Sequence, residues 1–178
     1  DAGDQARAQF QHGGVLAALA VNSVRERRGE TSRARTAYLF RSLKHPGEVE
    51  VLRLVYASSL IVISVYDNDD ARFRRLAQRI QRSGRGVEEA SQKARELMKR
   101  DQEGVDAKNK FGQSVRKTFP LADFFLDMGK ELRGQVERLI HLLFEHPFKS
   151  PTRDEYAMFT ARATALRSVD LSRQVGAV

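Results

Sequence analysis

The chain of 178 residues contains no cysteine and no tryptophan, and it has only four histidines. Without cysteine it can form neither a disulfide nor a thiolate metal site within these residues. The histidines show no HxxxH or HxxEH spacing, so they do not provide a metal-ligand set. We therefore assign no metal ligands and no catalytic residues to this segment.

A long apolar run is also missing, since a membrane-spanning helix needs about 20 consecutive apolar residues. The densest apolar stretch, residues 60–66, contains Ser64 and has the length of a strand. The first residues contain no apolar stretch typical of a secretory leader. The first residue is Asp1 rather than Met, and the sequence stops inside an apolar run. We expect a cytoplasmic protein without a membrane partner, and further residues beyond both ends.

Positive charge is in excess, with 31 Lys and Arg and a net charge of +8. Clustered cations would favour nucleic-acid binding, because they release counterions from phosphates. Here the basic residues are mixed with acids or spread over helical faces, which favours a solvated or phosphate-lined surface. A protein that handles polyphosphates would also carry such a charge.

Strands alternate with helices along most of the chain, which predicts right-handed βαβ units and a parallel sheet of the α/β class. Three strands are visible where a doubly wound sheet commonly has about five, so we expect further strands before Asp1. The expected strands are 36–40, 60–65 and 122–126, and the expected helices are 15–28, 46–56, one between Asn68 and Ser83, 88–101 as a surface helix or mobile flap, a basic turn at 113–118, and one from Gly129 to about 145.

A second domain is predicted to begin after a proline-flanked linker. We assign residues 1–146 to the first domain, 147–152 to the linker and 153–178 to the start of the second. A helix is expected over 153–167 with Tyr156, Phe159, Ala163 and Leu166 facing inward, followed by a strand over 174–178.

The second domain resembles the N-terminal part of deoxycytidylate deaminases. The similarity lies in Pro151-Thr152-Arg153-Asp154-Glu155-Tyr156, Ala165-Leu166-Arg167-Ser168 and Ser172-Arg173-Gln174-Val175-Gly176-Ala177-Val178. In that family a zinc site with H-x-E and P-C-x-x-C motifs follows further downstream. The resemblance implies that zinc ligands lie outside this segment, and that Ser172, Arg173 and Gln174 form the rim of the deaminase pocket.

The first domain resembles P-loop kinases of the dephospho-coenzyme-A kinase kind. The similar residues are Gly3, Asp4 and Arg7, residues 41–53, Arg72-Phe73-x-Arg75-Leu76, Arg100-Asp101, residues 112–118 and Ala122-Asp123. The pattern departs from the family in two respects. No G-x-x-x-x-G-K-[ST] loop is present, and Arg41 stands where a Walker-B-like strand would deliver an aspartate for Mg²⁺. Both departures favour nucleotide sensing over phosphoryl transfer.

Six residues of the first domain are candidates for nucleotide binding: Arg41, Lys44, Arg100, Asp101, Arg116 and Lys117. Arg41 and Lys44 follow a predicted parallel strand, where α/β sheets bind ligands. As an alternative, Arg41 forms an ion pair with Glu48 or Glu50 on the next helix. The other four resemble lid residues of the kinase-like family, and the alternative for them is a solvated basic helix face.

Together the two resemblances identify the chain as similar to bacterial anti-phage deoxycytidine-nucleotide deaminases. They imply zinc-dependent conversion of dCTP and dCMP to dUTP and dUMP, with a kinase-like domain that binds nucleotide, with or without Mg²⁺, and regulates the enzyme. They also imply a homo-oligomer and a nucleoside triphosphate effector. The alternatives are a binding module that senses a nucleotide or a regulatory RNA, and a small-molecule kinase.

Overall fold

The computed structural model describes residues 2–29, 34–103, 112–170 and 174–178. These residues form two compact units, Asp1–Leu132 and Arg133–Val178, which we call unit 1 and unit 2. The expected domain boundary lay at residue 146. The expected linker, residues 147–152, lies within unit 2, where Arg138 donates to the Ser150 carbonyl.

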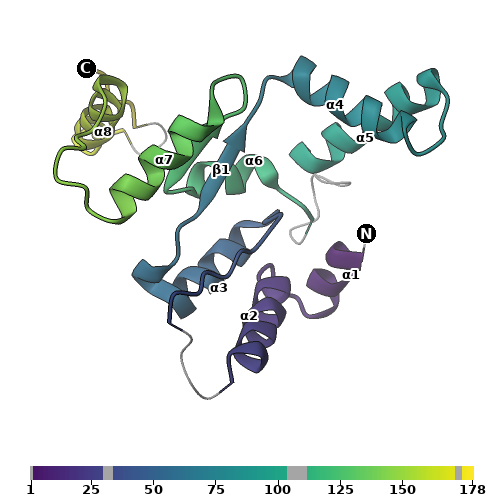
Figure 1. Ribbon diagram of the computed structural model, residues 1–178, viewed down its shortest axis with the longest axis horizontal. Helices are drawn as coiled ribbons and strands as arrows, with labels where there is room; N and C mark the ends of the chain where they lie inside the picture. The colour runs from purple at the N-terminus through teal and green to yellow at the C-terminus, as the bar shows by residue number, and fades with distance from the viewer. Residues whose placement is uncertain (1, 30–33, 104–111, 171–173) are drawn as a thin grey trace. The chain divides into compact units, whose positions relative to one another are not determined.

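Unit 1 combines helices with a small parallel sheet, as expected for the α/β class (Figure 1). Its helices and strands are α1 (Ala2–Gln9), α2 (Val15–Arg28), α3 (Pro46–Tyr56), the 3₁₀ turn η1 (Ala57–Ser59), β1 (Ile63–Tyr66), α4 (Asp69–Gln81), α5 (Val87–Glu103), α6 (Val115–Thr118), the 3₁₀ turn η2 (Phe119–Leu121) and β2 (Phe124–Asp127).

The first three helices pack together around a small apolar core. Ala17 of α2 and Val49 and Leu52 of α3 are buried. The loop between α1 and α2 comes so close to the start of α3 that a Cβ on Gly14 would lie 2.4 Å from the Gly47 carbonyl oxygen. Only glycine fits such an approach, so Gly14 permits the packing of this loop.

Three helices of unit 1, α2, α3 and α4, begin where the sequence predicts, whereas α1 was not expected. Asn68 is the N-cap of α4, with its side-chain oxygen 2.8 Å from the Ala71 amide nitrogen. The apolar stripe of α4, which includes Phe73 and Leu76, is half-buried and packs against α5, whose Ala90 and Ala94 are buried. The expected surface helix is therefore the second half of an α4–α5 hairpin, stabilised by small residues at the contact.

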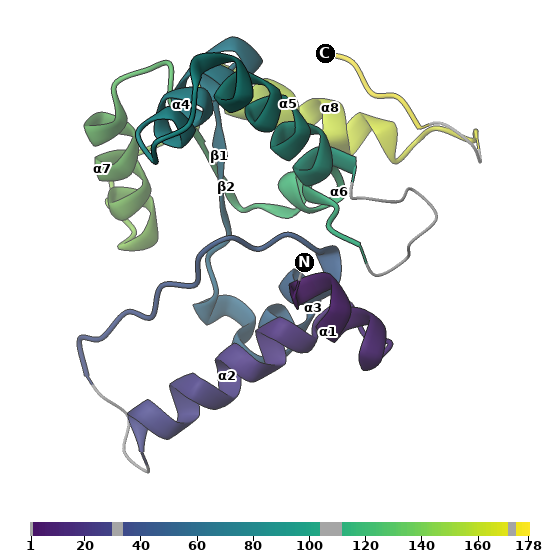
Figure 2. The ribbon, with the colours of Figure 1, turned by 90° about the vertical axis from the view of Figure 1, so that its right-hand side faces the viewer.

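β1 and β2 pair in parallel, with Ile63 opposite Phe124 (Figure 2). Asp123, expected at the start of its strand, binds the beginning of both strands. Its Oδ2 accepts from the Val62 amide at 2.8 Å, its own amide donates to the Val62 carbonyl at 2.8 Å, and its Oδ1 accepts from Arg53 of α3 at 2.9 Å. One carboxylate thus fixes the register and ties α3 to the sheet.

The prediction of a strand over residues 36–40 is wrong. These residues form no strand, Leu39 is 83% exposed, and the ring of Phe40 packs instead near that of Tyr56 on α3, 6.0 Å away. Among the residues that the structure describes, the sheet therefore has two strands rather than three. The strand expected over 60–65 is shifted to 63–66.

Unit 2 contains α7 (Leu132–Leu143, whose first residue belongs to unit 1) and α8 (Arg153–Ala165). Thr152 and Glu155 form a capping box at the start of α8. Arg138 of α7 donates to Glu155 and, at 3.1 Å, to the Ser150 carbonyl. This arginine connects the two helices through the cap of the second.

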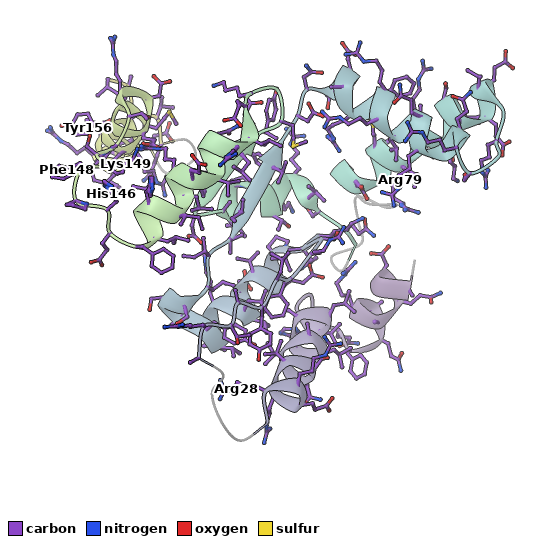
Figure 3. The ribbon with its side chains drawn as sticks, viewed as in Figure 1. Arg28, Arg79, His146, Phe148, Lys149 and Tyr156 are labelled. Atoms are coloured by element: carbon purple, nitrogen blue, oxygen red, sulfur yellow. The ribbon has the colours of Figure 1, made fainter. Side chains whose placement is uncertain are left out.

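The apolar faces expected for unit 2 are mostly exposed. On α7, Leu139 is buried, but Ile140 and Leu143 are exposed. On α8, Tyr156, Phe159, Ala163 and Leu166 were expected inward and are all exposed. Figure 3 labels Tyr156 and Phe148, two of the exposed aromatic residues of this unit.

The strand expected over 174–178 is absent, since these residues adopt no regular structure. They lie instead against the small-residue face of α8. A Cβ on Gly176 would stand 1.8 Å from the Ala161 carbonyl oxygen and 2.6 Å from the Ala165 nitrogen. Gly176 therefore allows backbone-to-helix contact that any other residue would prevent.

Candidate functional site

A pocket of about 480 Å³ lies at the carboxyl end of β1 in unit 1. In α/β proteins, ligands bind at this edge of a parallel sheet. Its walls come from the end of β1, the first turn of α4, and α6 with the residue after it, and they comprise Val65, Tyr66, Asp67, Asp69, Arg72, Val115, Arg116 and Phe119.

Two arginines supply the positive charge of the pocket. Arg116 is exposed and has no hydrogen-bond or ion-pair partner among the described residues. Arg72 Nη1 lies 3.5 Å from Asp69 Oδ1, a longer and weaker contact than an ordinary charged hydrogen bond. Asp67 is bound by Arg75, so the negative charge nearest the strand is already neutralised. The site therefore offers a guanidinium with free donors to an anionic ligand.

Two aromatic side chains, Tyr66 and Phe119, complete the lining. The position of Phe119 is fixed from both sides. Ser64 of β1 donates its hydroxyl to the Phe119 carbonyl at 2.9 Å, and the ring of Phe125 on β2 lies 5.3 Å from the Phe119 ring. A planar apolar ligand group could pack on such a held ring.

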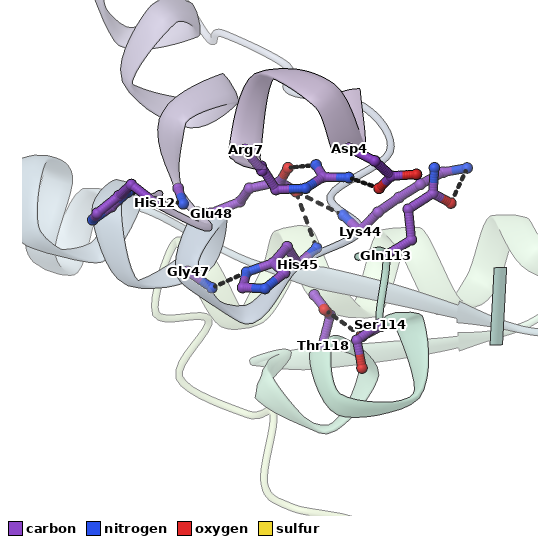
Figure 4. Close-up of polar contacts among 11 residues, drawn as sticks. Asp4, Arg7, His12, Lys44, His45, Gly47, Glu48, Gln113, Ser114 and Thr118 are labelled. Carbon is purple, nitrogen blue, oxygen red and sulfur yellow. Dashed lines mark hydrogen bonds and ion pairs between the residues drawn. The ribbon is translucent and has the colours of Figure 1, made fainter. Parts of the chain in front are cut away.

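A polar cluster around Lys44 lies beside α6 (Figure 4). Its Nζ is 2.9 Å from Asp101 Oδ1 at the end of α5 and 3.3 Å from Gln113 Oε1. Its carbonyl accepts from the Ser114 amide at 2.7 Å. Lys44 thus connects three segments: the loop before α3, the end of α5 and the start of α6.

A buried ion pair between α1 and α3 adjoins this cluster. Arg7 and Glu48 are 1% and 3% exposed, and Arg7 Nη1 donates to Glu48 Oε1 at 2.9 Å. Glu48 Oε2 accepts from the amides of Lys44 at 2.7 Å and His45 at 3.2 Å. The second guanidinium nitrogen, Arg7 Nη2, donates to Asp4 Oδ1 at 2.7 Å. Sequence reasoning quoted Arg7 and Glu48 within family patterns but did not predict their pairing.

The predicted nucleotide-binding residues have different surroundings. Lys44 and Asp101 are brought together, and Arg116 lines the pocket, whereas Lys117 is exposed and outside the lining. Arg100 has a buried Nε without a described hydrogen-bond partner.

Arg41 is exposed, and the alternative pairing with Glu48 or Glu50 is not formed; Arg7 binds Glu48 instead. In unit 2, Gln174 is exposed, and Ser172 and Arg173 lie outside the described residues. Sequence reasoning missed Tyr66 and Phe119 in the pocket. It quoted Arg72 for the resemblance only, although its place in the first turn of a helix after a strand could have indicated a role.

No group of three or more His, Cys, Asp or Glu able to hold a metal ion occurs among the described residues. The zinc ligands that the deaminase resemblance implies were expected outside this segment. No helix within the described ranges is long and apolar enough to cross a membrane.

Comparison of the chain with protein-family models, with curated proteins and with solved structures finds no match. The kinase-like and deaminase-like resemblances accordingly stay predictions.

Proposed function

We propose that unit 1 binds a nucleotide in the pocket at the end of β1. The observation that supports this best is the combination of Arg72 and Arg116 with Tyr66 and Phe119 in one pocket at the ligand-binding edge of a parallel sheet. Arginine suits phosphate because its planar donors bind two oxygens at once. The aromatic rings suit a base, which is flat and apolar on its faces.

Mg²⁺ bound to a triphosphate would require oxygen ligands from the protein or from water. Asp69 supplies the more accessible carboxylate of the pocket, since its side chain is 75% exposed, while Asp67 is 10% exposed and held by Arg75. Asp69 is therefore the residue that we assign to contact with a nucleotide-bound Mg²⁺. The proposed site senses a nucleotide and does not transfer its phosphate.

Equilibrium binding of dCTP to the chain tests the pocket. Arg116→Ala should weaken binding by about tenfold or more, because hydrogen bonds to charged groups contribute about 1.5–3 kcal/mol each. Lys117→Ala is the matched control, since Lys117 is the next residue of α6 and does not line the pocket. Equal affinities for wild type and Arg116→Ala, or no binding by wild type, would contradict the proposal.

We further propose that the chain is part of a deoxycytidine-nucleotide deaminase of anti-phage defence, a P-loop kinase-like domain joined to a deaminase domain. The support is the resemblance of residues 151–178 and the nucleotide-sized pocket of unit 1. When bound, zinc supplies the hydroxide that attacks cytosine, and its ligands would lie outside residues 1–178.

The full-length protein, incubated with zinc and with dCTP or dCMP, should produce dUTP or dUMP. The isolated 178 residues should produce neither, because the described residues hold no metal-ligand group. Absence of zinc-dependent product from the full-length protein would contradict the assignment, and turnover by the 178 residues would contradict the placement of the zinc site.

A second candidate function, RNA sensing, is favoured by the surface of α4. Between Asp70 and Glu88 the sequence has no acidic residue and six arginines, Arg72, Arg74, Arg75, Arg79, Arg82 and Arg85. Arg74, Arg79 and Arg82 are exposed and have no described partner, and Figure 3 shows the side chain of Arg79 extending away from the ribbon. Unpaired cations along one helix suit a phosphate backbone.

RNA binding should weaken steeply with salt, because each phosphate contact releases a counterion. Replacing the three unpaired arginines by glutamine should weaken the binding of a 20-nucleotide RNA (a probe length of about two helical turns) and reduce its salt dependence. Replacing Arg75 and Arg85 by glutamine is the control, since both are already ion-paired. Affinity independent of salt would exclude this function.

A further inference from the structure

We propose that Lys44 is a positioning residue that places Arg116 in the nucleotide pocket. The inference rests on the proposed nucleotide binding and adds a residue outside the pocket. Lys44 does not line the pocket. Its role follows from the way it holds the two residues that precede α6.

Lys44 binds the start of α6 through two different groups. Its Nζ contacts the Gln113 side-chain oxygen at 3.3 Å, and its carbonyl accepts from the Ser114 backbone amide at 2.7 Å. Asp101 Oδ1 of α5 lies 2.9 Å from the same Nζ and orients the ammonium group. The backbone direction at Gln113 and Ser114 is therefore set by Lys44.

This direction determines where Arg116 points, because α6 is only four residues long. So short a helix has no stability of its own and depends on external contacts. Its other internal contacts return to Ser114, whose carbonyl accepts from the Thr118 hydroxyl at 2.8 Å and the Thr118 amide at 3.0 Å. Gln113 and Thr118 are 4% and 6% exposed, so the helix is held at both ends while Arg116 between them is exposed.

A direct phosphate contact by Lys44 fits the structure less well. Its ammonium group already has two acceptors, one of them a carboxylate, and a ligand would have to displace them. Arg116 has no described partner to lose. In this proposal Arg116 binds the ligand, and Lys44 holds the backbone that positions Arg116.

A double-mutant cycle on dCTP binding tests the inference. Lys44→Met keeps an unbranched side chain of slightly shorter length and removes the charge. It should weaken binding by about fivefold, within the range for residues that share one network. In the Arg116→Ala background the same substitution should have almost no effect. Lys44→Arg should restore affinity to within about threefold of wild type, because it can still contact both acceptors.

A merely structural role for Lys44 predicts a different result: Lys44→Met would weaken binding by the same factor in both backgrounds, and Lys44→Arg would not rescue it. Either outcome overturns the inference. If Lys44→Met does not fold by circular dichroism, Gln113→Met replaces it in the cycle, with the same expectation and the same contrary result. Failure of the proposed function is distinguishable, because wild type would then not bind dCTP, or Arg116→Ala would bind it as wild type does.

Discussion

Removal of the Glu48 carboxylate should destabilise unit 1 more than any exposed substitution on the same helix. Glu48→Ala leaves the buried Arg7 guanidinium with its contact to Asp4, and it removes the Glu48 oxygen that accepts from the amides of Lys44 and His45. Breaking a buried pair costs about 3–5 kcal/mol, and loss of a helix cap about 1 kcal/mol. Because Asp4 continues to neutralise Arg7, we expect a total of about 3 kcal/mol.

Urea unfolding followed by circular dichroism measures this cost. With a slope of about 2 kcal/mol per molar, a loss of about 3 kcal/mol lowers the midpoint by about 1.5 M. Glu50→Ala is the matched control, because Glu50 lies two residues away on α3 and is exposed. Its effect should stay within about 0.5 kcal/mol.

The paired variant Arg7→Met with Glu48→Met separates the two contributions. Replacing both charges of a buried pair by apolar groups is often close to neutral, so the ion-pair part of the loss should be recovered. The two helix-start amides still lose their contact with the Glu48 carboxylate, and a deficit of about 1 kcal/mol should persist. A Glu48→Ala variant within 1 kcal/mol of wild type, by the scale of surface substitutions, would refute the reasoning.

Two further predictions concern unit 2. Burial alone would raise the pKa of Glu155, but hydrogen bonds from Arg138 and from the Thr152 backbone outweigh it and hold this pKa below its ordinary value. A carboxylate with a lowered pKa stabilises the fold at a pH above its unfolded-state pKa of about 4.3, and this contribution is lost as the pH falls through the folded-state pKa. The loss of helicity in acid should therefore be smaller in Glu155→Gln than in wild type. In Glu137→Gln it should be the same as in wild type. Gly176→Ala should release residues 174–178 from α8, because the added Cβ would lie 1.8 Å from the Ala161 carbonyl oxygen. The expected readout is faster proteolysis within residues 174–178. An unchanged rate of proteolysis would contradict the close packing.

Local signals explain which helices could be predicted. The run 15–28 ends in arginines before Gly29, Pro46 follows an N-cap, and Asn68 precedes an apolar stripe with helical spacing. These features act within one or two turns, so the chain need not be folded for them to be read. The three corresponding helices begin at the expected residues.

The strand expected over 36–40 shows the limit of the same approach. A short run of β-branched and aromatic residues stabilises a strand only where a neighbouring strand accepts its hydrogen bonds. In the structure Phe40 contacts Tyr56 of α3 instead, and Leu39 is exposed. The inward face expected for α8 fails for a similar reason, since periodicity identifies an apolar stripe but not what covers it.

Lys44 and Arg116 illustrate why site residues are harder to predict than helices. Sequence position made both cations equal candidates for phosphate contact. The partners of Lys44 are 57 and 69 residues away along the chain, so its pairing depends on the folded arrangement of three segments. Arg116 has no ion-pair partner among the residues that the structure describes, whereas a phosphate at Lys44 would have to compete with Asp101. Under the proposed nucleotide binding, Arg116 is therefore the ligand contact and Lys44 its support, and the number of acceptors around each nitrogen is the property that separates the two roles.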